Sequence, residues 1–583
     1  MAQNLLQEHL YGDLLAPTLG CHTDFAIGMT YSLGFDALLT AHLAFGMLGD
    51  MDENAVQSPH VLMEAILKNS DKMVVFCNKG SIAVPPTIRK VYSLLEKNIF
   101  EVFDPNNTTA NFHPKMWLIR EVHDDNKKDI LLKLIVSSRN MAYSDAIDCI
   151  VALTGKVGNA QTKNEKHSRL KKFIEKVVRY SNIGEEQKRK VMALAKDVER
   201  VQRFEVSAPF EDYDFYPYLF NEDFGLGKVE EYLCGTESII VSPFIDKSLL
   251  QRINPGRKGQ HALITRKEFV DADTFSSFDS KGGVYVTLDD LASRGMDIHA
   301  KMYLVNKGRD NQYLFLGSAN ATNSAFERNG ELLLGLKFEY GNSKYFHFLK
   351  CFCDEGDKDS KFIRLKQPHE KVSTVIRWDK AELATKDLMC AKDLSAKITR
   401  HRNGFFSIKV TSSLKKLENP VFIAPMQKSG IREQWKGSVL FDGLTADELS
   451  EFYIISSRLE EGVLHEAIIR IDTEGMPNER DSAIYKSIIK NKRDFMKFLE
   501  LMLTDSPVQY ILKEQTEKEI NFVGNGTETQ RLPQIYEQML RTTATNPNQI
   551  CQIKKILNKF DTDTVPEEFY VIFKQFEKAI KIK

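Results

Sequence analysis

Short hydrophobic runs alternate with amphipathic segments over the first 350 residues. Apolar stretches at 25–31 (FAIGMTY) and 73–78 (MVVFCN) predict short buried strands, and FDALLTAHLAFGML and VLMEAILKN between them have helical spacing. Two β-rich runs, WLIREV and ILLKLIVSS, flank the polar stretch DDNKKD and predict a hairpin with a charged tip. Strands that alternate with helices in this way favour an α/β fold.

A second region repeats this order after a charged helical connector at about 164–201. The run 238–245 (SIIVSPFI) resembles 73–78, because both are short buried runs before a loop, and strand signals follow at 261–269 and 283–288. IHAKMYLV then leads through NKGRDNQ to YLFLGSAN. A repeat of this length is too long for a solenoid, so it predicts two duplicated halves.

The pattern changes after about Lys350 to short alternating runs, which predict an antiparallel β-sandwich of about 100 residues. These runs are KVSTVIRWD, FFSIKVTSS, NPVFIAP, GSVLFDGL, FYIISSRL and HEAIIRID. Amphipathic helices follow from Asn478. The predicted divisions are a first half at 1–160, a connector at 161–202, a second half at 203–350, a β-rich domain at 351–475 and a helical region at 476–583.

Composition is that of an ordinary globular protein, with 42% hydrophobic and 27% charged residues among 583. The formal charge of -1 excludes a global positive field, so any anion site must be local. Eight scattered cysteines fit reduced thiols, and the pair in KCFCDEG lacks partners at zinc-ligand spacing. We expect no metal and no cofactor.

Neither a secretory signal nor a membrane span is predicted. The first residues lack a basic and then apolar pattern, and the apolar stretch 24–48 is interrupted by Asp36, His42 and glycines. We therefore expect a cytoplasmic protein that does not enter a membrane.

Candidate chemistry comes from a constellation that occurs twice, in the same order. Each copy has a His, a Lys two residues later, a Ser and an Asn after the next predicted strand, and then a carboxylate. The first copy is His113, Lys115, Ser138, Asn140 and Asp148, and the second is His299, Lys301, Ser318, Asn320 and Glu331. On extended strands the His and Lys of each copy would point to the same face.

If the halves meet face to face, these groups surround one anion, and the set suits a phosphodiester. The lysines and asparagines would hold the non-bridging oxygens, with the serines adding hydroxyl groups. One neutral imidazole would attack phosphorus, and the other, protonated, would give its proton to the leaving oxygen. A carboxylate should fix each ring, and sequence order favours Glu331 for His299 and Asp148 for His113.

These motifs resemble those of the phospholipase D superfamily: HAK at 299–301, GSAN at 317–320 and Glu331 match well, and HPK at 113–115 with SSRN at 137–140 more loosely. The resemblance covers about 20–345. It implies a pseudo-dimeric α/β/α sandwich with one site between the halves and a covalent phosphohistidine formed without metal. It also implies that His113 is the nucleophile and His299 the acid.

The chain departs from the common motif seven residues after each His, where Arg120 and Asn306 replace the usual Asp. This departure resembles the tyrosyl-DNA phosphodiesterases and metal-independent endonucleases of the superfamily, and favours DNA as substrate. Two alternatives stay open: a phospholipase or phosphatidyl transferase, and a degenerate module that only binds nucleic acid.

The stretch 476–499 resembles extensions of bacterial phospholipase-D-like proteins found beside ATPases in antiphage defence. The resemblance implies an antiviral effector nuclease whose C-terminal domains contact a HerA-like ATPase or helicase, in an assembly that could be oligomeric.

Three further features have two interpretations each. Trp117 and Tyr303 could face the site, although core packing is the simpler role. Arg139 could reach a phosphate or pair with Asp145. The stretch 397–416 has six Lys or Arg and no acid, with Phe405 and Phe406 between, and could track a nucleic-acid strand or form an ordinary basic sheet edge.

Overall fold

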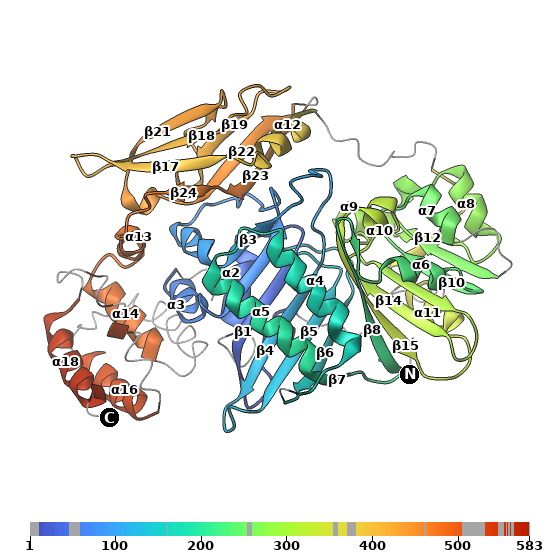
Figure 1. Cartoon of the computed structure of the whole chain (residues 1–583), viewed down its shortest axis with the longest axis horizontal. Coiled ribbons are helices and arrows are strands. Elements are labelled where there is room, and N and C mark those ends of the chain that lie inside the picture. The colour runs from blue at the N-terminus through green and yellow to red at the C-terminus, as the bar shows by residue number, and fades with distance from the viewer. Residues whose placement is uncertain are drawn as a thin grey trace.

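A computed structural model gives the fold of the chain (Figure 1). The structure describes residues 11–45, 59–159, 161–253, 259–353, 360–369, 380–459, 462–503, 531–545 and 565–581, with 553, 554, 557 and 560. The predicted run KVSTVIRWD, at 371–379, lies wholly outside these residues, as does most of the C-terminal stretch 551–560.

The first half is built on a seven-stranded mixed sheet in the order β3-β2-β1-β4-β5-β6-β7. Its strands are β1 (Cys21–Thr30), β2 (Met73–Asn78), β3 (Ile99–Val102), β4 (Met116–His123), β5 (Ile130–Ser137), β6 (Ile150–Val157) and β7 (Val201–Glu205). The first three strands pair in parallel and the others antiparallel. The predicted charged hairpin tip lies between β4 and β5.

The second half repeats this order in a nine-stranded sheet, β16-β12-β11-β10-β13-β14-β15-β8-β9. Its strands are β8 (Phe210–Leu219), β9 (Glu222–Asp223), β10 (Glu237–Val241), β11 (Gln260–Ile264), β12 (Val284–Thr287), β13 (Met302–Asn306), β14 (Gln312–Gly317), β15 (Gly330–Phe338) and β16 (Phe362–Arg364). The duplication is therefore present in the topology.

Strand pairing shows which strands of the two halves correspond. β10, which carries the run 238–245, pairs antiparallel with β13 just as β1 pairs with β4. Its counterpart is therefore β1 and not β2, the strand of 73–78. Buried runs of similar length look alike in sequence, and only their pairing distinguishes them.

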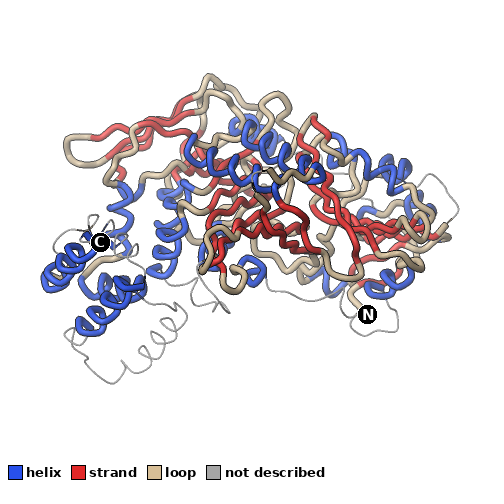
Figure 2. Tube along the Cα trace, turned by 60° about the horizontal axis from the view of Figure 1, so that its bottom comes forward, coloured by secondary structure: helices blue, strands red, loops and turns tan. Residues whose placement is uncertain are grey.

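Helices cover both sheets (Figure 2). One apolar layer contains residues of both sheets. Alternate residues of β1 show how a strand serves two layers: Phe25, Ile27 and Met29 enter the shared core, whereas Ala26 enters the outer one. Helices α4 (Ser168–Arg179) and α5 (Glu185–Arg200) of the predicted connector contribute to the shared core.

The outer helices complete the layers. On the first half these are α1 (Tyr11–Leu15), α2 (Phe35–Ala44) and α3 (Pro59–Asn69), with the 3-10 helix η3 (Lys90–Lys97). On the second half they are α6 (Gly227–Leu233), α7 (Lys247–Ile253), α8 (Ala272–Asp279) and α10 (Asn323–Glu327). The short α9 (Asp289–Ser293) follows β12, and α11 (Tyr345–Cys353) joins the shared core.

The β-rich domain is a sandwich of two four-stranded sheets, with orders β21-β18-β17-β24 and β20-β19-β22-β23. The predicted antiparallel pairing is present except between β17 and β24, which pair in parallel. Its strands are β17 (Ser395–Arg400), β18 (Phe406–Thr411), β19 (Phe422–Pro425), β20 (Glu433–Gln434), β21 (Ser438–Leu444), β22 (Phe452–Arg458), β23 (Leu464–Arg470) and β24 (Asp472–Glu474). One core lies between the sheets, and α12 (Lys380–Met389) packs against it.

The C-terminal helices are α13 (Arg480–Ile488), α14 (Lys492–Leu503), α16 (Arg531–Thr545) and α18 (Glu567–Lys581). They share the outer core of the first half with α2, α3, β22 and β23. The β-rich and helical parts therefore dock on the first half, as Figure 1 shows.

Candidate active site between the two halves

Two short main-chain pairings join the halves at the repeated motifs. Phe112 forms a parallel bridge with Gly330, and Ile147 forms one with Ile298. The amide of His113 donates to the Gly330 carbonyl at 2.8 Å, and the amide of His299 donates to the Ile147 carbonyl at 2.9 Å. Each His is thereby set beside the carboxylate-bearing segment of the other half.

Each imidazole is hydrogen bonded through Nδ1 to a carboxylate from the opposite half. His113 Nδ1 lies 3.0 Å from Glu331 Oε2, and His299 Nδ1 lies 2.7 Å from Asp148 Oδ1. The predicted pairing, Glu331 with His299 and Asp148 with His113, is therefore wrong. The bridges place the His of each motif copy beside the carboxylate of the other copy. The order of the motifs along the chain does not show which copies come together. With Nδ1 engaged, Nε2 is the nitrogen left for a substrate.

The two serines hold these carboxylates. Ser138 Oγ donates to Asp148 Oδ1 at 2.6 Å, and Ser318 Oγ donates to Glu331 Oε2. Each hydroxyl also accepts a main-chain amide, that of Cys149 or of Leu332. The sequence analysis placed these hydroxyls on the bound anion. In the structure they instead donate to the carboxylates that hold the histidines.

Lys115 and Lys301 are almost completely buried, with 1% and 0% exposure. Both lie in the extended segments just before β4 and β13, and not on the strands as predicted. Each ammonium turns back to the carbonyl of its own His, at 3.0 Å from the His113 oxygen and 2.5 Å from the His299 oxygen. The described residues place no carboxylate within ion-pair distance of either ammonium.

Burial makes both ammonium groups easier to deprotonate. It lowers the pKa of Lys301 to about 8, and burial together with the Lys301 charge holds the pKa of Lys115 well below its ordinary value. An anion between them would relieve both effects.

Asn140 and Asn320 follow β5 and β14 at matching places. The Oδ1 atom of each is buried without a hydrogen-bond partner among the described residues. A buried polar atom without a partner is uncommon, and both amides can still orient toward a ligand.

The two His–carboxylate pairs differ in their electrostatics. Burial, with Lys115 and Lys301 close by, holds the pKa of His113 well below its ordinary value, and burial raises the pKa of Glu331 to about 8. Burial also lowers the pKa of His299, against the opposing hydrogen bond to Asp148. For Asp148, burial acts to raise the pKa, but the hydrogen bonds from His299 and Ser138 outweigh it. Asp148 is thus the better-ionised partner.

Three residues that the sequence did not single out support the His113 segment. Asn78 Oδ1 accepts the Phe112 amide at 2.8 Å, and Asn329 Nδ2 lies 3.4 Å from Glu331 Oε1. The Tyr31 ring lies 5.3 Å from the His113 ring. Asn329 sits two residues before Glu331, which is the one signal that could have marked it.

The remaining candidates lie away from the site or have other partners. Trp117 and Tyr303 are buried in the outer cores of their halves, so the packing interpretation is confirmed.

Arg139 donates to the Ser144 carbonyl at 2.8 Å. Arg120 pairs with Asp24 and Asp197, and Asn306 donates to Glu237 at 2.5 Å. The two positions that lack the usual Asp thus have structural partners.

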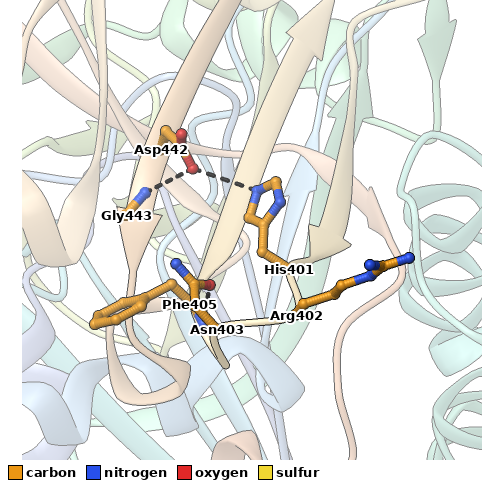
Figure 3. Close-up of a pocket in the computed structure, with 6 residues that line it drawn as sticks. All are labelled: His401, Arg402, Asn403, Phe405, Asp442 and Gly443. Carbon is orange, nitrogen blue, oxygen red and sulfur yellow. Dashed lines mark hydrogen bonds and ion pairs between the residues drawn. The ribbon is translucent and has the colours of Figure 1, made fainter.

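The basic stretch forms β17, β18 and the turn between them, and its tip borders a pocket of about 660 Å³ (Figure 3). His401, Arg402, Asn403 and Phe405 line it, with Asp442 and Gly443 from β21. His401 Nε2 lies 3.3 Å from Asp442 Oδ1. None of the paired-histidine residues lines this pocket, so it is a separate feature of the β-rich domain.

The described residues contain no group of three or more His, Cys, Asp and Glu side chains arranged to hold a metal ion. Among the same residues, no helix combines the length and apolar character needed to cross a membrane.

Comparison with known proteins gives a structural likeness only. No family model matches the chain, and no curated protein matches it. Crystal structures of yeast tyrosyl-DNA phosphodiesterase align with it. One structure has 14% identity and a TM-score of 0.33 over 56% of this chain and 85% of the other. A mutant form has 12% identity and a TM-score of 0.36 over 63% and 95%. At these identities and scores the likeness does not bear on function.

Proposed function

We propose that the chain is a metal-independent phosphodiesterase that cleaves nucleic acid, with DNA as the favoured substrate, through a covalent phosphohistidine. One observation carries the proposal: two imidazoles, each fixed through Nδ1 by a carboxylate of the opposite half, share a site with two buried ammonium groups. The arrangement supplies a nucleophile, an acid and positive charge in one place.

In the first step His113 Nε2 attacks phosphorus, and the bond between phosphorus and the leaving oxygen breaks. The reactive form carries its proton on Nδ1, hydrogen bonded to ionised Glu331, so that the Nε2 lone pair is available. Protonated His299 gives the Nε2 proton to the leaving oxygen, and ionised Asp148 stabilises its positive charge.

In the second step His299, now neutral, removes a proton from water as the water oxygen attacks phosphorus. The P–N bond breaks, and the product leaves as a phosphate monoester. Lys115 and Lys301 neutralise charge on the non-bridging oxygens in both steps, and Asn140 and Asn320 donate from their amides.

Deeper burial favours His113 as the nucleophile. Its side chain is 14% exposed, against 20% for His299, and its pKa is held lower, so it is the ring kept neutral. His299 faces the better-ionised carboxylate and is the more readily protonated when an anionic substrate binds.

Nucleic acid is preferred to lipid because Arg120 and Asn306 stand where the lipid-cleaving relatives have Asp, as in the DNA-processing branch that the motifs resemble. By the same resemblance, we propose an endonuclease role in cytoplasmic antiphage defence, with the C-terminal region contacting a HerA-like ATPase or helicase. Exposed apolar side chains on α16 and α18, Tyr536, Leu540 and Val571, are available for such a contact.

The test is incubation of the purified chain with plasmid, single-stranded DNA, RNA and liposomes in EDTA. We expect cleavage of nucleic acid and no release of lipid head groups. His113→Ala and His299→Ala should abolish cleavage, whereas His22→Ala, at an exposed His outside the site, should not. Complete loss of activity in EDTA would rule out the mechanism, head-group release would favour the lipid alternative, and binding without cleavage would favour the degenerate module.

A further inference from the structure

Helix α12 of the β-rich domain reaches the segment that carries His113. Lys386, in its last turn, lies with Nζ 3.4 Å from Asn111 Oδ1, two residues before the nucleophile. One turn earlier, Glu382 acts electrostatically on Tyr31, whose ring lies 5.3 Å from the His113 ring. This helix, labelled near β22 in Figure 1, therefore lies next to the segment that carries His113.

Asn111 connects Lys386 to the active site by a short series of contacts. Its carbonyl accepts the Gly330 amide at 2.8 Å, and its amide donates to Asn329 Oδ1 at 3.2 Å. Asn329 in turn contacts Glu331, the carboxylate that holds His113. Lys386 thus contacts the segment that carries His113 and is connected to Glu331 through Asn111 and Asn329.

A second cation, Arg328 from the second half, directly precedes Asn329, whose Oδ1 accepts the main-chain amide of the same Asn111 that Lys386 contacts. Burial lowers the pKa of Lys386, and the Arg328 charge lowers it further. Nε of Arg328 is buried without a hydrogen-bond partner, and the described part of the chain gives its guanidinium no ion pair. Two cations held together, one with an unused buried donor, suit a shared anion, and guanidinium is well matched to phosphate.

We propose that Lys386 and Arg328, with the side-chain amide of Asn111, form a second phosphate subsite that binds the phosphate next to the scissile one along a polynucleotide. The inference rests on the proposed function and deepens it. A lipid or a single nucleotide ester has no neighbouring phosphate on the same chain, so the subsite would select polymers. Because Lys386 belongs to the β-rich domain, that domain would contribute directly to substrate choice.

The test compares substrates with the same leaving group, p-nitrophenolate. One is the p-nitrophenyl ester of thymidine 5′-monophosphate. The others are two oligothymidylates, one with the p-nitrophenyl ester at its 5′ end and one with it at its 3′ end. Lys386→Gln and Arg328→Gln should raise KM for the oligomer about tenfold and leave kcat/KM for the nucleotide within about twofold. Lys386→Arg should restore the oligomer KM. Lys392→Gln, at an exposed position just beyond α12, is the matched control.

A parallel binding measurement uses fluorescent oligothymidylate and the His113→Ala background. Loss of one phosphate contact should lower the slope of log Kd against log salt by about 0.7 for a single strand. Equal effects on both substrates would overturn the subsite, since Lys386 would then only position His113. Unchanged oligomer KM and salt slope would overturn it as well. If the wild type cleaves neither substrate, the proposed function is wrong. The salt dependence of binding then still shows whether Lys386 and Arg328 contact a phosphate.

Discussion

Lys301 is the clearest case of a single residue whose burial opposes stability. Moving its pKa from 10.5 to about 8 corresponds to roughly 3 kcal/mol between the charged and neutral forms. The folded-state pKa lies below the unfolded value, so the unfolded chain binds more protons between pH 8 and 10.5. Stability from this group therefore rises as the pH rises through that window.

Lys301→Met should consequently raise the apparent Tm of the ligand-free protein at pH 7, because the buried charge is removed. Inorganic phosphate should raise the Tm of the wild type and leave that of the variant nearly unchanged. Thermal unfolding with and without phosphate measures both effects. A lower Tm in the variant would show that the ammonium stabilises the empty site, contrary to the prediction.

For a p-nitrophenyl ester, whose leaving group needs no proton from His299, the pH dependence of kcat/KM should reflect Glu331 and Lys301. Activity should rise toward pH 8 as Glu331 loses its proton, since the reactive His113 carries its own proton on Nδ1. It should fall above pH 8 as Lys301 loses its charge. Lys301→Arg should shift the alkaline limb upward, and Lys247→Arg, at an exposed lysine, should not. An alkaline limb unchanged in Lys301→Arg would assign it to another group.

At the scale of strands and helices, the sequence predicted a good part of this architecture. Period-two and period-3.6 patterns located β1, β2, β4, β5 and β10 to β14, but not β3, β6 to β9, β15 or β16. The repeated His and Lys phrase located the candidate site. It missed the crossing of the copies, because the Phe112–Gly330 and Ile147–Ile298 bridges join residues far apart in the chain. For the same reason it could not place Lys386 beside Asn111.

The crossing predicts which carboxylate serves which histidine. With a p-nitrophenyl ester, whose leaving group needs no acid, Asp148→Asn should behave like His299→Ala and retain a burst of p-nitrophenolate. Glu331→Gln should behave like His113→Ala and lose the burst. Rapid-quench or stopped-flow absorbance measures this. If Asp148→Asn lost the burst as His113→Ala does, the result would instead support the pairing of Asp148 with His113 and of Glu331 with His299.

Across the whole molecule, the C-terminal parts dock on the first half through a buried ion pair. Arg480 and Glu96 are 6% and 3% exposed and hydrogen bonded to each other, and Ser450 Oγ donates to Glu96 at 2.6 Å. This contact joins α13, η3 and the segment before β22, and it helps to fix the β-rich domain that carries α12.

Arg480→Met should destabilise the protein by about 3–5 kcal/mol, because it leaves the Glu96 charge buried without its partner. The double variant Glu96→Gln with Arg480→Met should recover part of the loss. Arg400→Met, which breaks an exposed pair with Glu479, should change stability by less than about 1 kcal/mol. Denaturant unfolding measures all three. Equal effects of Arg480→Met and Arg400→Met would mean that the docking contact contributes little.

The most direct test of the shared site is to locate the covalent intermediate. His299→Ala is incubated in EDTA with the p-nitrophenyl ester of thymidine 5′-monophosphate and denatured at alkaline pH, where the P–N bond survives. Mass spectrometry should then find one thymidylyl group on His113 and none in the His113→Ala variant. An adduct on another residue, or release of p-nitrophenolate in EDTA without any adduct, would contradict the account.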